Sequence, residues 1–144
     1  MNDSTQPDID RLITEQMAEA LIYADTEGVI RQWNAAAEAL FGYPRQQAIG
    51  QSLDLIIPER LRAAHWAGFH RAMVQGTTRL HGRATVTRAL TKDGKSIYVE
   101  MSFAVVSDGN AKAIGSVAVA RDATQRHLDE SALRARLAAL AGDA

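Results

Sequence analysis

The segment from residue 79 to residue 123 constrains the fold more than any other part of the sequence. It contains three runs rich in β-branched and apolar residues, RLHGRATVTRAL, SIYVEMSFAVVS and AIGSVAVARDA. The linkers between them, TKDGK and SDGNAK, each contain an Asp-Gly pair, which favours a hairpin turn. Consecutive strands joined by hairpins pair antiparallel, so we expect strands over 79–90, 96–107 and 113–123.

The first half of the chain adds two strands and a series of helices. ALIYADTEGVIRQWN contains two short apolar runs around a turn at residues 25–28, which predicts a hairpin. Asn34 is a suitable N-cap for a short helix that Gly42 can end. A longer helix is expected over 59–75, after Pro58. Five antiparallel strands, with helices between the second and the third, predict an α+β fold.

Two amphipathic helices are expected to flank this core, over residues 8–20 and 125–141. Their apolar positions recur with a helical period, and they are Ile9, Leu12, Ile13 and Met17, then Leu133, Leu137 and Leu140. An apolar stripe with nothing to cover in a monomer needs a partner, so we expect a homodimer through these helices. The expected organisation is a lead-in and helix over 1–20, a core over 21–123 and an output or linker helix over 124–144.

Composition and motifs exclude several classes of function. The chain has 144 residues, a formal net charge of -1 and no cysteine, which predicts one domain without disulfides or thiolate metal sites. This charge balance does not favour nucleic-acid or membrane binding. No apolar run approaches the ~20 residues of a membrane span, and MNDSTQPD does not resemble a signal peptide. We therefore expect a cytoplasmic protein. No hydrolase or phosphate-binding motif is present, so we do not expect an enzyme.

Three segments in the right order resemble a PAS domain over roughly residues 10–130. They are GVIRQWNAAAEALFGYPRQQAIGQSL, TKDGKSIYVEMS and RDATQRHLDE. The positions that match in the first segment are Gly28, Asn34, Phe41, Gly42, Tyr43 and Gly50. The resemblance implies a sensory domain with a five-stranded antiparallel sheet, and with short helices and one long helix on one face. It also implies that Asp122 and Thr124 join the sheet to an output helix.

The segment from Pro58 onward is similar to the haem-binding PAS oxygen sensors of the FixL type and of the direct oxygen sensor phosphodiesterase type. His65 follows Pro58 by seven residues, as the iron-binding histidine does in those sensors. The resemblance implies b-type haem held through His65, and the sensing of oxygen, carbon monoxide or nitric oxide. It implies propionate contacts from Arg71 and Arg79. The apolar residues expected around the haem are Phe69 beside His65 and Leu80, Met101 and Phe103 in the distal wall.

The sequence departs from both types of sensor on the distal side of the expected haem. Both types have an arginine where this chain has Thr85, and the phosphodiesterase type has a methionine ligand where this chain has Arg83. Residues 81, 83 and 85 share one face of the predicted strand. Arg83 is therefore a candidate hydrogen-bond donor to a bound gas, and His81 is a candidate sixth iron ligand.

The alternative is a PAS module without haem. The pattern PERxRxxHxxGF also resembles PAS domains in which the histidine packs in the core. The chain would then be a dimerisation or interaction module in a two-component or transcriptional regulator, with an empty pocket or a small organic ligand. Under both hypotheses the signal passes to a downstream effector domain or protein. His70, one helical turn after Trp66, is expected to lie beside it at the margin of the apolar face, and His127 is expected in the output helix.

Overall fold

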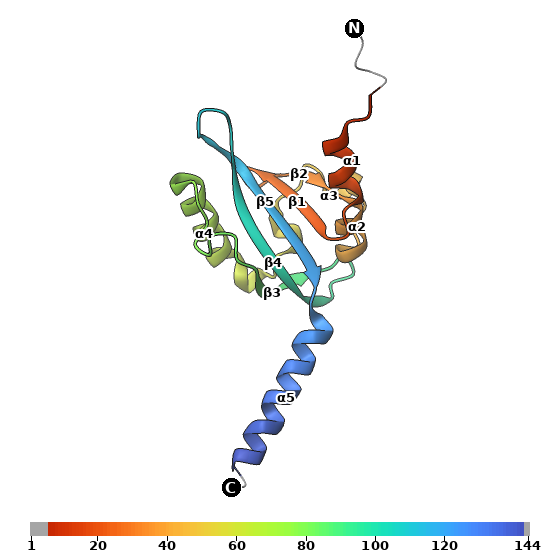
Figure 1. Ribbon diagram of the computed structural model, residues 1–144, viewed down its shortest axis with the longest axis vertical. Coiled ribbons are helices and arrows are strands. Elements are labelled where there is room, and N and C mark those ends of the chain that lie inside the picture. The colour runs from red at the N-terminus through yellow and green to blue at the C-terminus, as the bar shows by residue number, and fades with distance from the viewer. Residues whose placement is uncertain (1–5, 143–144) are drawn as a thin grey trace.

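The computed structural model describes residues 6–142, which form an α+β fold (Figure 1). The strands are β1 (Ala20–Asp25), β2 (Ile30–Trp33), β3 (Thr85–Leu90), β4 (Ser96–Ser107) and β5 (Ala113–Asp122). They form one sheet in the order β2-β1-β5-β4-β3, and every neighbouring pair is antiparallel. The predicted five-stranded antiparallel sheet is confirmed.

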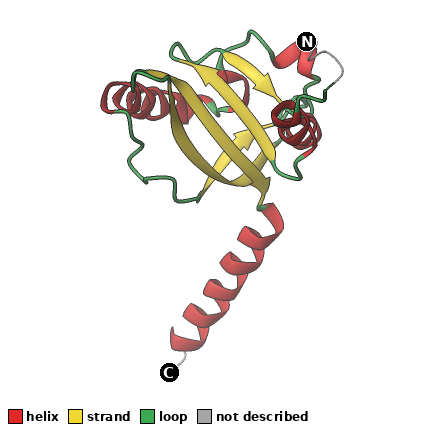
Figure 2. Ribbon diagram, turned by 45° about the horizontal axis from the view of Figure 1, so that its top comes forward, coloured by secondary structure: helices red, strands yellow, loops and turns green. Residues whose placement is uncertain are grey.

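The helices between β2 and β3 link the two edge strands of this sheet. They are α2 (Ala35–Phe41), α3 (Arg45–Ala48), the 3-10 helices η2 (Leu53–Ile56) and η3 (Glu59–Leu61), and α4 (Arg62–Gln75). Alternate residues of β1, such as Ile22 and Ala24, are buried, as expected for a strand with one face against a core. The core combines these strand residues with helix residues such as Phe41 and Phe69. Figure 2 shows the helices and the twisted sheet.

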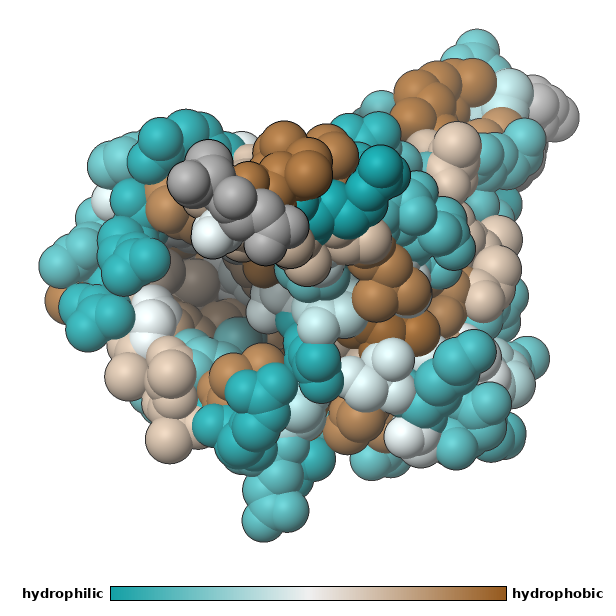
Figure 3. Space-filling model, turned by 90° about the horizontal axis from the view of Figure 1, so that it is seen from below, coloured by the Kyte–Doolittle hydropathy of each residue, from teal (hydrophilic) through white to brown (hydrophobic). Residues whose placement is uncertain are grey.

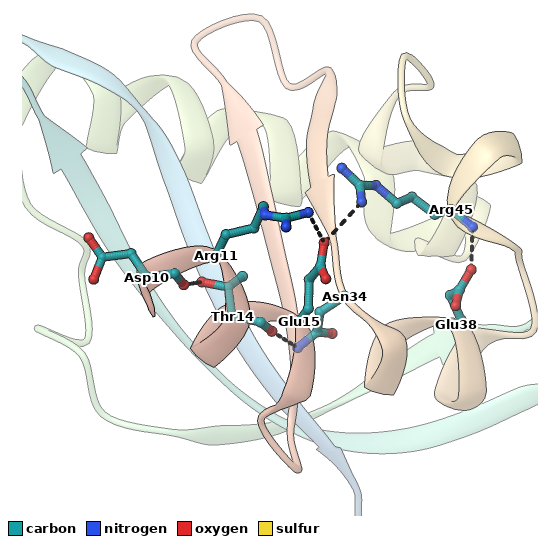
Figure 4. A network of polar contacts seen from close by, with 7 residues as sticks. All are labelled: Asp10, Arg11, Thr14, Glu15, Asn34, Glu38 and Arg45. Carbon is teal, nitrogen blue, oxygen red and sulfur yellow. Dashed lines mark hydrogen bonds and ion pairs between the residues drawn. The ribbon is translucent and has the colours of Figure 1, made fainter. Parts of the chain in front are cut away.

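A buried asparagine ties the N-terminal helix α1 (Ile9–Gln16) to the sheet. The Asn34 side chain is 2% exposed. Its Oδ1 accepts hydrogen bonds from the backbone N–H groups of Leu21 and Ala37, and its Nδ2 donates to the carbonyls of Thr14 and Glu19. Asn34 therefore caps α2, as predicted, and also holds the end of α1. Figure 4 shows the contact with Thr14.

The N-terminal helix is shorter than its apolar pattern predicts. It ends at Gln16 because Met17 has an extended backbone, with φ -61° and ψ 151°. The prediction of a helix through residue 20 is wrong, since Ala20 already begins β1. Glu15 pairs with Arg11 at 3.7 Å and with Arg45 at 3.3 Å, which joins α1 to α3 (Figure 4).

The third strand begins six residues later than predicted. Residues 77–84 lie outside any strand, with turns over 79–82, and β3 starts at Thr85. Within these turns His81 has φ 50° and Gly82 has φ 82°, which is left-handed backbone that a strand cannot contain. The prediction of a strand over 79–84 is therefore wrong, and the alternation that placed His81 and Arg83 on one face with Thr85 does not apply.

The C-terminal helix α5 (Thr124–Gly142) projects away from the sheet (Figures 1 and 2). Its start is fixed at the predicted Asp-x-Thr junction. The Asp122 carboxylate accepts from the Thr124 N–H at 2.8 Å, and the Thr124 hydroxyl accepts from the Tyr98 N–H at 3.0 Å. No described residue of α5 is buried. Within residues 6–142, no helix has the length and apolar character that a bilayer crossing requires.

Candidate functional site

A cavity of about 480 Å³ lies between α4 and the inner face of the sheet. Its helix wall includes Ala64, His65, Gly68 and Arg71, and its sheet wall includes Ile22, Thr85, Thr87, Val99, Met101, Phe103 and Ala118. A volume of this size falls in the range of small-molecule and cofactor sites. The cavity is therefore large enough for a ligand of substantial size.

A second cavity of about 220 Å³ adjoins the first. His65, Arg79 and Phe103 line both cavities. Phe69, Met73, Leu80 and Arg83 line only the smaller one. The molecule seen from below is hollowed on the side of α4, with apolar groups inside and hydrophilic groups around the rim (Figure 3). His65 therefore stands where the two cavities meet.

One ring nitrogen of His65 takes part in no hydrogen bond with the described residues. This atom, Nδ1, is also buried. Burial lowers the pKa of His65 below its ordinary value of 6.5, and nearby His70 lowers it further, although the carboxylate of Asp54 acts in the opposite direction. His65 is therefore neutral at pH 7, with a nitrogen lone pair available to a ligand.

Trp66, the residue after His65, is held by two other segments of the chain. Its Nε1 donates a hydrogen bond to the Asp54 carboxylate at 2.8 Å. Its ring lies so close to Gly28 that a Cβ atom there would overlap it. As expected, His70 lies beside Trp66, with ring centroids 6.0 Å apart and planes at 29°. The contacts with Asp54 and Gly28 join residues distant in sequence, so periodicity gave no signal for them.

The cavities contain cationic side chains and no carboxylate. Arg71 lines the larger cavity and Arg79 lines both, whereas no Asp or Glu is among the residues that line either. Arg88 also lines the larger cavity, but its guanidinium donates to the Tyr98 hydroxyl at 2.5 Å and lies over that ring. An unbalanced positive charge favours a ligand that carries carboxylates.

The structure brings most of the predicted site residues together. Those at the larger cavity are His65, Arg71, Arg79, Met101 and Phe103, and those at the smaller cavity include Phe69, Leu80 and Arg83. His81 lines neither cavity. Thr87 and Ser116 also line the larger cavity, and the sequence gave no reason to select them.

These residues fit a haem better than a metal ion bound by side chains alone. Among residues 6–142, no group of three or more His, Asp or Glu side chains is placed to hold a metal ion. Haem iron needs only one or two protein ligands, and a proximal histidine is a common one. His65 offers a neutral imidazole with an unpartnered nitrogen, and the apolar walls and the arginines suit a porphyrin ring and its propionates.

The outer face of β4 has a different set of contacts, which the sequence did not reveal. The Tyr98 ring stacks on His127 of α5, with centroids 3.9 Å apart and planes at 22°. The Glu100 carboxylate accepts from Arg126 of α5 at 3.1 Å and from Arg121 of β5 at 2.8 Å. The hydrogen bond from Arg126 has the largest effect on the pKa of Glu100, which it lowers, and the hydrogen bond from Arg121 lowers it further. The first turns of α5 are thus attached to the strand that lines the cavity.

Comparison with known proteins identifies the family. The profile of the PAS fold matches residues 9–123. The chain is 27% identical over 99 residues to the sensor protein FixL of Bradyrhizobium diazoefficiens, which covers 69% of this chain and 20% of FixL. It is 35% identical over 75 residues to the oxygen sensor protein DosP of Escherichia coli, which covers 52% of this chain and 9% of DosP. The chain thus spans a fifth or less of these relatives.

A solved structure supports the same assignment at the level of the fold. The PAS domain of a protein from Colwellia psychrerythraea superimposes with a TM-score of 0.71 at 24% sequence identity, covering 81% of this chain and 96% of that domain. The sheet order, the helices between β2 and β3, and the profile match over residues 9–123 agree. This chain belongs to the PAS family and is a PAS sensory domain.

Proposed function

We propose that this PAS domain binds b-type haem through His65 and senses a diatomic gas. The observation that carries the proposal is the buried, unpartnered Nδ1 of a neutral imidazole that lines both cavities. A buried polar atom without a partner costs about 1–3 kcal/mol. A bound ligand that used the free capacity of this ring would offset the cost.

Two arginines support the same ligand. The propionates of a haem need cations, because burying a bare carboxylate is costly. Arg71 and Arg79 lie at the cavity, the first on α4 and the second in the turns that follow it. They would bind the propionates and so fix the orientation of the haem. The haem, when bound, supplies an iron that can take up oxygen, carbon monoxide or nitric oxide.

The apolar sheet wall would exclude water from the gas-binding side. Met101 is 5% exposed and lies in the core cluster, against which Phe103 also packs. Arg83 lines only the smaller cavity, and its Nε donates to the Leu80 carbonyl at 3.4 Å. Arg83 would have to move with the segment 77–84 to donate a hydrogen bond to a gas. Thr85 already lines the larger cavity.

The relatives support a sensory role and leave the effector to be found. FixL is named a sensor protein and DosP an oxygen sensor protein, and each is much longer than the matched segment. We propose that this domain, which has no catalytic role, passes its signal from β4 to α5 and then to an effector domain or protein. The exposed leucines Leu133, Leu137 and Leu140 of α5, with Ile9 and Ile13 of α1, would pair in a homodimer.

A haem titration tests the proposal, with His70→Ala as the matched control for His65→Ala. Both histidines lie on α4, but His70 is exposed and lines neither cavity. We expect the wild type and His70→Ala to take up one haem per chain, with a Soret band that shifts on reduction and on adding carbon monoxide. We expect His65→Ala to lose this defined spectrum. Equal spectra for the two variants would contradict the role of His65.

The second candidate is a small organic carboxylate in the same cavity. Arg71 and Arg79 favour it independently of His65, since no Asp or Glu is among the residues that line the cavity. In that case the wild type would take up no haem in a defined ratio. Instead, a dicarboxylate would raise the melting temperature of the protein, and Arg79→Gln would abolish the increase. The domain would then be a PAS interaction module controlled by a metabolite.

A further inference from the structure

The direction of His65 depends on how α4 is rotated about its own axis. Phe69 is the one buried residue of α4. The helix has no side-chain hydrogen bond at its N-cap, Leu61. Successive residues of an α-helix are about 100° apart around the axis. Any group that fixes the direction of Trp66 therefore also fixes the direction of His65.

Trp66 is held on two sides by segments outside the helix. On one side its ring lies against Gly28, in the turn between β1 and β2, where no side chain could fit. Gly28 also has φ 77°, a backbone conformation that glycine adopts most readily. On the other side the Nε1–H of Trp66 donates to Asp54 of η2 at 2.8 Å. These contacts restrain both the position of the indole ring and its rotation.

Asp54 also contacts Arg62, the first residue of α4. The Nε of Arg62 lies 3.8 Å from the Asp54 carboxylate. The same guanidinium donates to the backbone carbonyls of Asp54 and Ile57. The η2 segment therefore binds α4 at its first residue and again four residues later, on the turn that carries His65.

The Trp66 ring contacts the His65 ring directly. Their centroids are 4.8 Å apart with the planes at 77°, an edge-to-face arrangement. Phe69 closes the other side of the same cluster, 5.3 Å from Trp66 and 6.1 Å from His65. Movement of the indole would remove the nearer of the two aromatic neighbours of the imidazole.

We propose that Trp66, hydrogen-bonded to Asp54 and seated on Gly28, is the positioning residue that directs the His65 imidazole into the cavity. The consequence for haem affinity rests on the proposed function. The orientation of the imidazole itself does not. Groups that orient a metal ligand in this way commonly change metal affinity about 10–100-fold when they are removed.

The test compares Asp54→Asn with Asp54→Leu. Asparagine keeps an oxygen that can accept from the indole, and leucine is of similar size without an acceptor. Glu59→Leu is the matched control, since it also replaces a carboxylate near the start of α4, on an exposed residue. We expect the rate of haem loss from Asp54→Asn and from Glu59→Leu to lie within about twofold of the wild-type rate. The rate of haem loss from Asp54→Leu should be at least about tenfold higher than that of the wild type. Equal rates for Asp54→Leu and Glu59→Leu would overturn the proposal.

A second readout uses protein without haem. Nuclear Overhauser effects between the Trp66 and His65 rings should persist in the wild type and Asp54→Asn and weaken in Asp54→Leu. If Asp54→Leu does not fold, Trp66→Phe, which keeps an aromatic ring but lacks the N–H, replaces it in the haem-loss assay. If the wild type takes up no haem, the proposed function fails, and the ring contacts alone decide the positioning role. Unchanged ring contacts in Asp54→Leu would overturn it.

Discussion

The two faces of β4 differ in both composition and neighbours. The inward residues Val99, Met101 and Phe103 line the cavity through apolar contact. The outward residues Tyr98 and Glu100 make directed contacts with α5, by ring stacking and by charged hydrogen bonds. Adjacent residues of a strand face opposite sides, so the cavity and the output helix are separated by a single strand. Under the proposed function, a ligand would therefore move α5 by displacing β4, without any contact of its own with the helix.

The largest expected effect comes from the inward face. Met101→Ala removes most of a buried side chain and should lower the free energy of unfolding by about 3 kcal/mol, the usual range for such cavities. Urea unfolding measures this change. Amide exchange at residues 124–128 should stay at the wild-type rate in native buffer, because Met101 does not face α5. Faster exchange there, with β4 still protected, would break the distinction between the two faces.

A smaller effect is expected from the outward face. Tyr98→Ala removes the stack on His127 and the hydroxyl that accepts from Arg88, and should cost about 1 kcal/mol. Amide exchange should accelerate at residues 124–128, while the cavity and any haem spectrum stay unchanged. Tyr98→Phe is the control, since it keeps the stack. If Tyr98→Phe and Tyr98→Ala accelerate exchange equally, the stack does not hold α5.

The pH dependence of stability should follow protonation of the half-buried His65 imidazole. The pKa of His65 is lowered in the folded protein, so the unfolded chain binds this proton more readily. The contribution of the neutral ring to the free energy of unfolding is therefore fully present above about pH 6.5, the pKa in the unfolded chain. It is lost as the pH falls through the lower pKa of the folded protein. Melting temperatures of haem-free protein between pH 7.5 and 5 should fall less steeply in His65→Leu. If the melting temperature fell equally with pH in the wild type and in His65→Leu, protonation of His65 would not contribute to the pH dependence of stability.

The smallest effect is expected at the charged contact between β4 and α5. Glu100→Gln removes the charge that Arg126 and Arg121 share. These groups are exposed to solvent to different degrees, and such pairs contribute little to global stability. The change should appear as faster exchange in the first turn of α5 at low salt, and should disappear at high salt as screening increases. A salt-independent difference would mean that charge is not the cause.

Much of the fold could be predicted from local patterns. The period-two runs and the Asp-Gly turns located β4 and β5, and Asn34 and Gly42 marked the ends of α2. The start of β3 could not be predicted, since the run from Arg79 to Leu90 has strand-like composition throughout. The backbone at His81 and Gly82 is left-handed, and a histidine does not by itself mark such a position in a sequence.

The candidate site was predictable only where a residue type carries a signal. His65 stands out because an imidazole among the apolar positions of a helix either packs in the core or binds a ligand. Asp54 and Trp66 carry no such signal, since their hydrogen bond joins different elements. The contact of Trp66 with Gly28 spans still more of the sequence. Contacts of this kind follow from tertiary packing and produce no periodic pattern of residue types in the sequence.

The central claim is that His65 provides the ligand to a haem iron, and replacement of its side chain by free imidazole tests it most directly. His65→Gly should bind haem weakly and give an altered spectrum. Adding imidazole should restore the wild-type spectrum of the reduced, carbon-monoxide-treated protein, because the small molecule occupies the space of the missing ring. The same addition should leave His70→Gly unchanged. A His65→Gly protein whose haem spectrum already equals that of the wild type, before imidazole is added, would contradict the account.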